Sequence, residues 1–494
     1  MDIDMDVDDQ PSPPSPPAPI LSSNNAARRS HYNYIVPVDD NHPFDLDSYI
    51  GNYSGRTAID RLIRIVSVCP GVAVDAFNLA IQHIHQSRDP SLYQPLCNAY
   101  ELVSSYPGVQ LPSMNELHGL DTRWVDEVVK RNHQEKVKLE GELKTYSNNM
   151  IKESIRLGHR DLAEFYRSVG DYPAALKHWT KSREFCTTSQ HVLDGCISIL
   201  ELLIEQRNYA HLPTYVFKAE SSLEGATAST IKDKDGGSGN RKNSSTIADV
   251  DVLRSKLDFA NALSQLSQGN YERAAYFFLR MGTGTSGLGD WFGKLVSQAD
   301  IAIYGCVCAL GSLSRSAFKV QVIENLSFGA YIEQESYVRE AVEAYMGSNF
   351  RAVLETLSRN NTRHTIDIHL APHIETLNSL TRSRLVTLYF TPFSSIKLDR
   401  MADAFGWSVE ETEEYVVGLI RSGDIKGRVD SQGKILQVRS SDGRAELFVN
   451  AVRKGLEMQQ ANKKMLFRMK LQQLDVVIKA PKPQQGGSMI DVAD

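Results

Sequence analysis

Apolar residues recur at helical spacing through most of the chain between residues 44 and 379. In DRLIRIVSV, for example, Leu62, Ile63 and Val66 fall on one face of a helix, and VDAFNLAIQHI repeats the pattern after a break at Pro70. The pattern predicts a mainly α protein whose helices each bury one face.

Three stretches share one local form, a small residue, then Asp or Asn, then an aromatic residue that opens a mostly apolar helix. They are GDYPAALKHW at 170–179, GNYERAAYFF at 269–278 and SNFRAVLETL at 348–357. This form resembles the helix-turn-helix of tetratricopeptide (TPR) repeats, in which small residues let two helices approach closely. Degenerate, unevenly spaced copies predict a TPR-like solenoid, with a generic helical bundle as the alternative.

The pattern changes after residue 380. RSRLVTLYFTPF and IKLDRMADAFGW predict two helices, and a third begins at a Ser408–Glu411 capping box and stops at Gly423. IKGRVD and KILQV then flank a Ser-Gln-Gly turn, which predicts a β-hairpin. Three helices followed by a hairpin are typical of a winged helix.

Many winged helices bind DNA through the third helix, but this one begins with Glu410, Glu411, Glu413 and Glu414. Four carboxylates at that position would repel phosphates, although acidic residues in a first turn also simply stabilise a helix dipole. The formal net charge of −6 and the pI near 6.1 also argue against nucleic acid as the main partner.

A long amphipathic helix is expected from residue 445 to about 478. Ala451, Met458 and Met465 are spaced seven residues apart, and further apolar side chains flank them. Such a Met-rich stripe packs either on its own domain or on a helix of a partner.

Both ends of the chain and one internal segment lack this patterning. The acidic, proline-rich N-terminus, the loop 225–249 and the tail 479–494 are expected to be unstructured. The six cysteines include no CxxC pair, which predicts free thiols, and no apolar run approaches the length of a membrane span. We therefore expect a protein of the cytoplasm and nucleus.

No motif predicts catalysis or a cofactor. GTGTSG at 282–287 matches GxGxxG but follows a helix, and Gly293-Lys294 is followed by leucine where a P-loop needs Ser or Thr. The pair His83-x-His85 matches the start of a zinc isopeptidase motif, but Tyr93 and Leu96 occupy the positions of its serine and aspartate. Two histidines spaced two apart on a helix point in different directions, so no metal site is expected.

Five segments resemble the first-subunit family of the COP9 signalosome, whose members are PCI-domain proteins, in the order of that family. They are FDLDSYIGNYSGRTAIDRLIRIVSVCP, GHRDLAEFYRSVGDYPAALKHWTKSREFCTTSQHV, ADIAIYGCVCALGSLSR, HLAPHIETLNSLTRSRLVTLYFTPF and GRVDSQGKILQV. The resemblance implies a non-enzymatic scaffold that joins other signalosome subunits through its winged-helix edge and a bundle of C-terminal helices. The assembled complex would remove Nedd8 from cullins, so cullin-RING ligases would be indirect partners, with no nucleic acid or membrane involved.

The expected organisation is thus an unstructured N-terminus (1–43), a TPR-like region (44–379), a PCI winged helix (380–440), a C-terminal helix (441–478) and a tail (479–494). The alternatives are a PCI subunit of the proteasome regulatory lid and a winged-helix nucleic-acid binder. The residues expected at subunit interfaces are Ile425, Gly427, Val429, Ile435, Leu436, Val438, Phe448, Val452, Met458, Met465, Leu466 and Met469.

Overall fold

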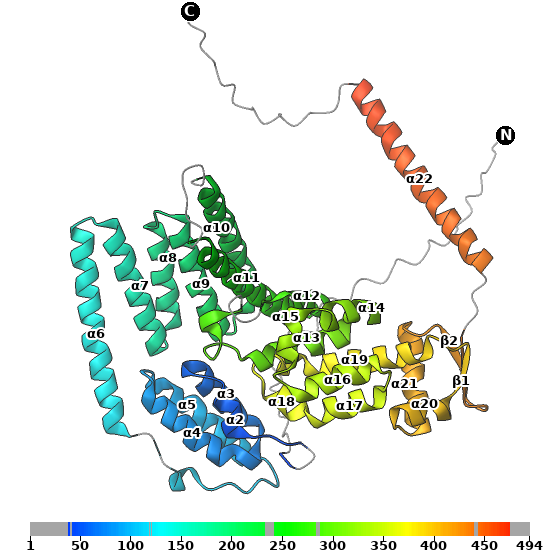
Figure 1. The fold of residues 1–494 in the computed structure, drawn as a ribbon, viewed down its shortest axis with the longest axis horizontal. Helices are drawn as coiled ribbons and strands as arrows, with labels where there is room; N and C mark the ends of the chain where they lie inside the picture. The colour runs from blue at the N-terminus through cyan, green and yellow to red at the C-terminus, as the bar shows by residue number, and fades with distance from the viewer. Residues whose placement is uncertain are drawn as a thin grey trace, which may run out of the picture. The chain divides into compact units, whose positions relative to one another are not determined.

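The structure is a computed structural model that describes residues 38–39, 42–117, 119, 121–232, 242–282, 287–438 and 443–474. The chain divides into two compact units, Met1–Tyr389 and Phe390–Asp494. Helices dominate the described residues, and the three strands belong to one small sheet (Figure 1). The predicted mainly α fold with a small wing is confirmed.

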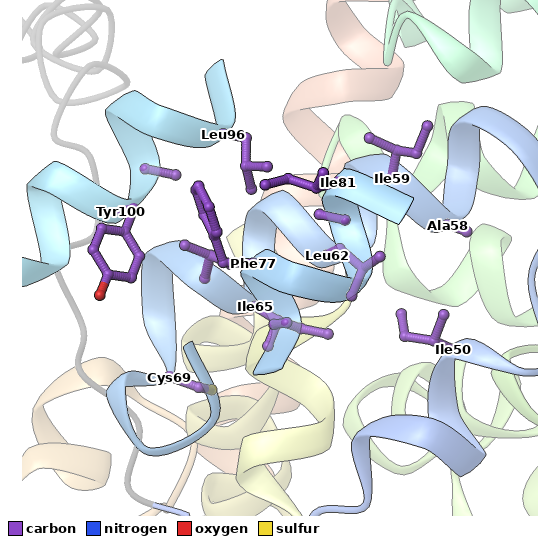
Figure 2. Packing of buried hydrophobic residues seen from close by; sticks show 14 of the residues in the cluster. Ile50, Ala58, Ile59, Leu62, Ile65, Cys69, Phe77, Ile81, Leu96 and Tyr100 are labelled. Carbon is purple, nitrogen blue, oxygen red and sulfur yellow. The ribbon is translucent and has the colours of Figure 1, made fainter. Parts of the chain in front are cut away.

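The first unit begins with helices that enclose an apolar core (Figure 2): α2 Leu46–Ile50, α3 Gly55–Val68, α4 Ala73–Gln86 and α5 Tyr93–Ser104. On α3, Leu62 and Val66 are fully buried and Ile63 is partly buried, as their helical spacing predicts. Within the described residues no single helix is long and apolar enough to cross a membrane. By length and composition, α3 and Pro70–Gln86 pass that test only as a pair, bent by 120°.

The middle of the first unit is a series of helices, each packed against the next (Figure 1). This sequential packing confirms a repeat solenoid. The helices are α6 Thr122–Asn148, α7 Lys152–Val169, α8 Tyr172–Glu184, α9 Ser189–Glu205, α10 Leu212–Lys232, α11 Lys242–Ser267, α12 Tyr271–Arg280 and α13 Gln298–Ser312.

Shorter helices complete this unit, and α19 carries the chain into the second one. They are α14 Arg315–Phe318, a π-helical turn Lys319–Ile323, α15 Leu326–Ile332, α16 Ser336–Met346, α17 Phe350–Arg359, α18 Asn361–Ile366 and α19 Ile374–Phe390.

All three predicted repeat turns share one backbone geometry. The residue that ends each first helix is left-handed, with φ of 89° at Gly170, 77° at Gly269 and 60° at Ser348. The Asp or Asn that follows donates its N–H to the carbonyl five residues earlier, at 2.9 to 3.0 Å. This is the bond that closes a Schellman-type helix end, so the turn satisfies the last carbonyls of one helix while it starts the next.

A fourth copy of this turn lies at residues 207–209, and the sequence pattern missed it. Arg207 has φ of 58°, and Asn208 N–H donates to Leu203 O at 2.9 Å. The sequence pattern required a small residue at the left-handed position, and this copy has arginine there. Tyr209 then occupies the aromatic position.

The aromatic residue of each turn reaches a segment outside its own helix pair. The guanidinium of Arg56 lies 5.5 Å from the ring centre of Tyr172, and Phe350 packs against the ring of Tyr389. The hydroxyls of Tyr209 and Tyr271 lie 2.6 and 3.4 Å from Nδ1 of two histidines, His369 and His373. The repeated turn therefore also connects its helix pair to other segments of the first unit.

A buried ionic network joins the ends of the first unit. The guanidinium of Arg61 on α3 is fully buried and lies 3.1 Å from Asp300 Oδ2 and 2.7 Å from Asp367 Oδ2. These partners lie 239 and 306 residues away in sequence, at the start of α13 and just after α18. The network thus ties three distant segments together.

Further groups complete the network. Nη2 of Arg363 lies 3.2 Å from Asp300 Oδ1, and its guanidinium lies over the ring of Tyr49. Tyr304 donates its hydroxyl to Asp367 Oδ2 at 2.7 Å. Burial alone would raise the pKa of Asp367, but Arg61 and the neighbouring His369 outweigh it and hold that pKa well below its usual range.

The predicted unstructured segments need two revisions. Val38 packs against the N-terminal core and Asp39 forms a β-bridge with His42, so ordered chain begins before residue 44. Within 225–249, both flanking helices extend into the segment: α10 continues to Lys232 and α11 begins at Lys242. Residues 1–37, 233–241 and the tail 479–494 lie outside the described residues.

We predict that Arg61→Met lowers the free energy of unfolding of the first unit by about 3–5 kcal/mol, because it leaves buried carboxylates without their cation. Urea unfolding followed by circular dichroism measures the effect. The matched control is Arg351→Met, which removes an exposed ion pair with Glu355 and should cost less than about 0.5 kcal/mol. Equal losses in the two variants would contradict a structural role for the network.

We also predict that the contribution of His364 to stability falls as the pH drops from about 6.5 to about 4. Burial, together with the charge of Arg363, lowers the pKa of fully buried His364 to about 4. The unfolded chain therefore binds a proton in this window that the folded chain does not, which is about 1.4 kcal/mol per pH unit. The unfolding free energy of His364→Gln, plotted against pH over this range, should have a slope that is smaller than that of wild type by about 1.4 kcal/mol per pH unit, which corresponds to one proton.

The comparison between wild type and variant is required because burial raises the pKa of Asp258 to about 6, which acts with the opposite sign. Identical slopes in the two proteins would show that His364 does not titrate as predicted.

Candidate assembly surfaces

The second unit contains the last two predicted helices of the winged helix and its hairpin: β1 Ser395–Lys397, α20 Leu398–Phe405, α21 Val409–Ser422, β2 Gly427–Asp430 and β3 Ile435–Val438. The first predicted helix, in RSRLVTLYFTPF, is the end of α19, which belongs to the first unit up to Tyr389. α20 ends at Gly406 and α21 at Gly423, and both glycines are left-handed. At the start of α21, the Ser408 hydroxyl accepts the N–H of Glu411 at 3.2 Å, which is the serine half of the predicted capping box.

The buried face of α21 is centred on Thr412, Val416 and Leu419. Val409 and Ile420, also predicted for this face, are half-buried at its margins.

The glutamates of the third helix serve two purposes. Glu413 accepts the Lys434 ammonium and the Ser431 hydroxyl, each at 2.5 Å, and so fixes the hairpin against α21. Hydrogen bonding to Lys434 lowers the pKa of the Glu413 carboxyl. Glu410, Glu411 and Glu414 remain exposed, so the surface that a DNA-binding winged helix would present to phosphates is acidic.

The sheet has a strand that the sequence pattern missed. Ile396 and Lys397 were assigned to the second helix, but Ser395–Lys397 forms β1. The strand order is β1-β3-β2, with both pairs antiparallel. The three residues of β1 are followed directly by α20, and only one of them, Ile396, has a buried side chain. One buried residue is compatible with a strand and with the start of a helix, so the sequence pattern did not distinguish the two.

This extra strand corrects part of the predicted interface. Ile435, Leu436 and Val438 lie on β3, which is paired on both sides, so these residues cannot form an open edge. Ile425 and Leu436 are 3% and 0% exposed and belong to the core of the unit. For these two residues an interface role is wrong, because their side chains pack internally.

Backbone hydrogen bonds show which way β3 faces. Val438 N–H donates to Ser394 O, and Leu398 N–H donates to Lys434 O. In an antiparallel pair the bonded residues alternate, so the even-numbered residues of β3 direct their backbone groups toward β1.

The outer edge of β2 follows from this alternation. The odd-numbered residues of β3 face β2, where their partners are Arg428 and Asp430. Gly427 and Val429 therefore direct their N–H and C=O groups away from the sheet. These two predicted residues lie on a strand edge that no other described strand covers, and such an edge can pair with a neighbouring chain.

The predicted C-terminal helix is present as α22 Gly443–Gln473. All six of its predicted interface residues have exposed side chains, between 46% and 71%: Phe448, Val452, Met458, Met465, Leu466 and Met469. The prediction was incomplete, since further large apolar side chains on this helix and just after it are equally exposed: Leu447, Val449, Leu456, Phe467 and Leu474.

Projected at about 100° per residue, these side chains cover about 200° of the circumference of α22. Arg453, Glu457, Lys464 and Arg468 occupy the opposite face. A stripe that packs against one partner helix is much narrower than this. The helix therefore has enough apolar surface to contact at least two neighbouring helices.

None of the motifs considered for chemistry forms a site in the described residues. His85 lies against the ring of Trp124, and Lys294 Nζ bonds to Glu201 at 2.6 Å. No group of three or more potential metal ligands occurs in the part of the chain that the structure describes. Four residues of GTGTSG, 283–286, lie outside the described residues.

Comparison with known families agrees with this architecture. A model described as 26S proteasome subunit RPN7 matches residues 121–321, and a PCI domain model matches residues 357–440. The second match begins in α17, upstream of the winged helix itself.

Similar proteins are named as subunits of two assemblies. The chain is 33% identical over 438 residues to COP9 signalosome complex subunit 1 of Arabidopsis thaliana, covering 88% of this chain and 91% of that protein. Identity to subunit 1b of Drosophila melanogaster is 29%, covering 91% and 89%. 26S proteasome non-ATPase regulatory subunit 6 of Caenorhabditis elegans is more distant, at 22% identity over 74% and 80%.

Proposed function

Because the chain belongs to the family of COP9 signalosome subunit 1, we propose that it is a non-catalytic assembly subunit supporting the removal of Nedd8 from cullins. The reaction itself would take place at a zinc isopeptidase site on another subunit. The observation that carries the proposal is the breadth of exposed apolar surface on α22, which a chain acting alone would leave in contact with water.

The two assembly surfaces differ in the kind of contact that they offer. The outward backbone groups of Gly427 and Val429 suit a strand from a neighbouring winged helix, whose register they would define. The apolar face of α22 suits a bundle with the C-terminal helices of other subunits. Cullin-RING ligases would be substrates of the assembled complex, not ligands of these surfaces.

Two alternatives have weaker support. A PCI subunit of the proteasome lid would fit the fold, but the lid relatives are the more distant ones. A nucleic-acid binder would have to place exposed Glu410, Glu411 and Glu414 against phosphates. Affinity purification of the native chain separates the first two: deneddylase subunits support our proposal, and proteasomal ATPases would overturn it.

The six cysteines form no disulfide, as a reducing compartment allows, and we place the subunit in the cytoplasm and nucleus.

We predict that Val429→Pro weakens incorporation into the complex at least five-fold, because proline has no N–H to give a neighbouring strand. Proline is tolerated at a sheet edge, so the unit should still fold. The control is Val429→Ala, which shortens the same side chain and keeps the N–H. Competition between tagged variants and wild type during reconstitution, read by quantitative mass spectrometry, measures the effect. Equal incorporation of the two variants would exclude strand addition at β2.

We further predict that Met458→Glu combined with Met465→Glu reduces incorporation more than ten-fold. Each change would place a carboxylate in an apolar interface and remove a side chain whose burial contributes about 1.5–3 kcal/mol. The matched control is Asn450→Glu with Gln460→Glu, which adds the same charges on the polar face of α22. Co-elution on size-exclusion chromatography should be lost only in the methionine variant, and loss in both would point to a general effect of charge.

A further inference from the structure

A pocket of about 210 Å³ lies between α7, α8 and α9 in the first unit. Its lining includes Trp179 and Ser182, which are 4% and 5% exposed, together with Arg160, Arg183 and His191 nearer the surface. None of these residues belongs to the assembly surfaces of the second unit. The volume is too small for a folded partner and suits a single chemical group.

Several polar nitrogens that line this pocket have no hydrogen-bond partner among the described residues. Nε1 of Trp179, Nε of Arg160 and Nδ1 of His191 are enclosed and form no hydrogen bond with the described residues. The indole N–H can only donate, and leaving a buried donor without an acceptor costs free energy of folding. A ligand that supplied acceptor oxygens at this position would recover that cost.

The charges around the pocket favour an anion. The guanidinium of Arg156 is occupied by Glu153, but Arg183 has no hydrogen bond or ion pair among the described residues. Arg160 has only distant carboxylates, with its Nε 3.7 Å from both Asp161 and Glu164.

Three further features affect the positive charge around the pocket but do not neutralise it. Asp194, the other acidic residue of the lining, accepts from Gln190 of its own helix at 2.9 Å. His191 Nδ1 lies 3.9 Å from Glu153. The pocket is also next to the first turns of α9, whose N-terminus adds a positive partial charge.

A neighbouring groove of about 790 Å³ shares Glu164, Trp179 and Ser198 with the pocket but differs in its charges. There Arg167 pairs with Glu201 and Glu205, and Arg56 pairs with Asp89. Those cations are already neutralised, so the groove as a whole has no preference for anions. The preference is specific to the smaller pocket.

We propose that the pocket between α7, α8 and α9 binds a phosphate group. Arginine guanidinium groups match phosphate oxygens in pairs, and a phosphate has a third oxygen for the indole N–H of Trp179. A carboxylate ligand has only two oxygens, and Arg160 already has a carboxylate, that of Glu164, nearby. The phosphate is either free inorganic phosphate or the phosphate of a phosphorylated side chain, since both present the same oxygens.

The full-length chain labelled with ¹⁵N-tryptophan tests this, because it contains only four indole N–H groups and Trp179→Phe identifies the one at the pocket. Titration with inorganic phosphate at constant ionic strength should shift the Trp179 resonance in a saturable way and leave the others in place. Arg183→Ala should weaken binding at least five-fold. Arg273→Ala, an exposed arginine on α12, is the matched control and should bind like wild type.

Two further titrations separate the sources and exclude a weaker interpretation. N-acetyl-O-phosphoserine amide that binds more tightly than inorganic phosphate identifies a phosphorylated segment as the ligand, and the reverse order identifies free phosphate. Sodium acetate that produces the same shift at the same concentration would overturn the assignment to phosphate. So would binding that is unchanged in Arg183→Ala, or the absence of a saturable shift. Equilibrium dialysis with radiolabelled phosphate gives the affinity without any resonance assignment.

Discussion

The buried contact of Arg61 with Asp300 and Asp367 is the constraint on which the first unit depends. In a repeat protein each helix pair contacts only its neighbours, and the ends of the array are independent of each other. Here α3, the start of α13 and the segment after α18 meet at one guanidinium that is entirely removed from water. A buried cation is tolerated only where its partners are in place, so the helices between these segments must have the length and curvature that bring the partners together.

The local parts of this fold could be predicted because they depend on neighbours in sequence. The left-handed residue, the Asp or Asn and the aromatic residue of each repeat turn lie within three positions, so the form is visible in a sequence. The copy at Arg207 escaped because arginine there adopts a conformation usually given to small residues. The network could not be predicted, because Asp300 and Asp367 both lie more than 200 residues from Arg61 in the sequence. The one available signal was that Arg61 is a charged residue on α3 next to the buried residues Leu62 and Ile65.

The assembly surfaces show the same division between local and distant information. Alternating residues correctly predicted the two strands of the hairpin, but whether a strand is an edge depends on what pairs with its other side. Ser395–Lys397 supplies that pairing from 38 or more residues upstream of β3, in a segment short enough to be taken for the start of a helix. Because β1 covers one side of β3, Ile435 does not lie on a sheet edge, whereas Gly427 and Val429 do. On α22 heptad spacing identified one side of the apolar face, but it missed side chains such as Phe467 that make the face too broad for one partner helix.

These two surfaces have complementary physical properties. An open strand edge gives direction and register through hydrogen bonds, each of which contributes only about 0.5–1.5 kcal/mol net. An apolar helix face contributes more free energy but tolerates sliding, because burial of apolar area has no preferred direction. When both are carried on one short chain, binding at one surface raises the effective concentration of the other. A subunit built in this way can hold a defined position in a large assembly even though neither surface would do so alone.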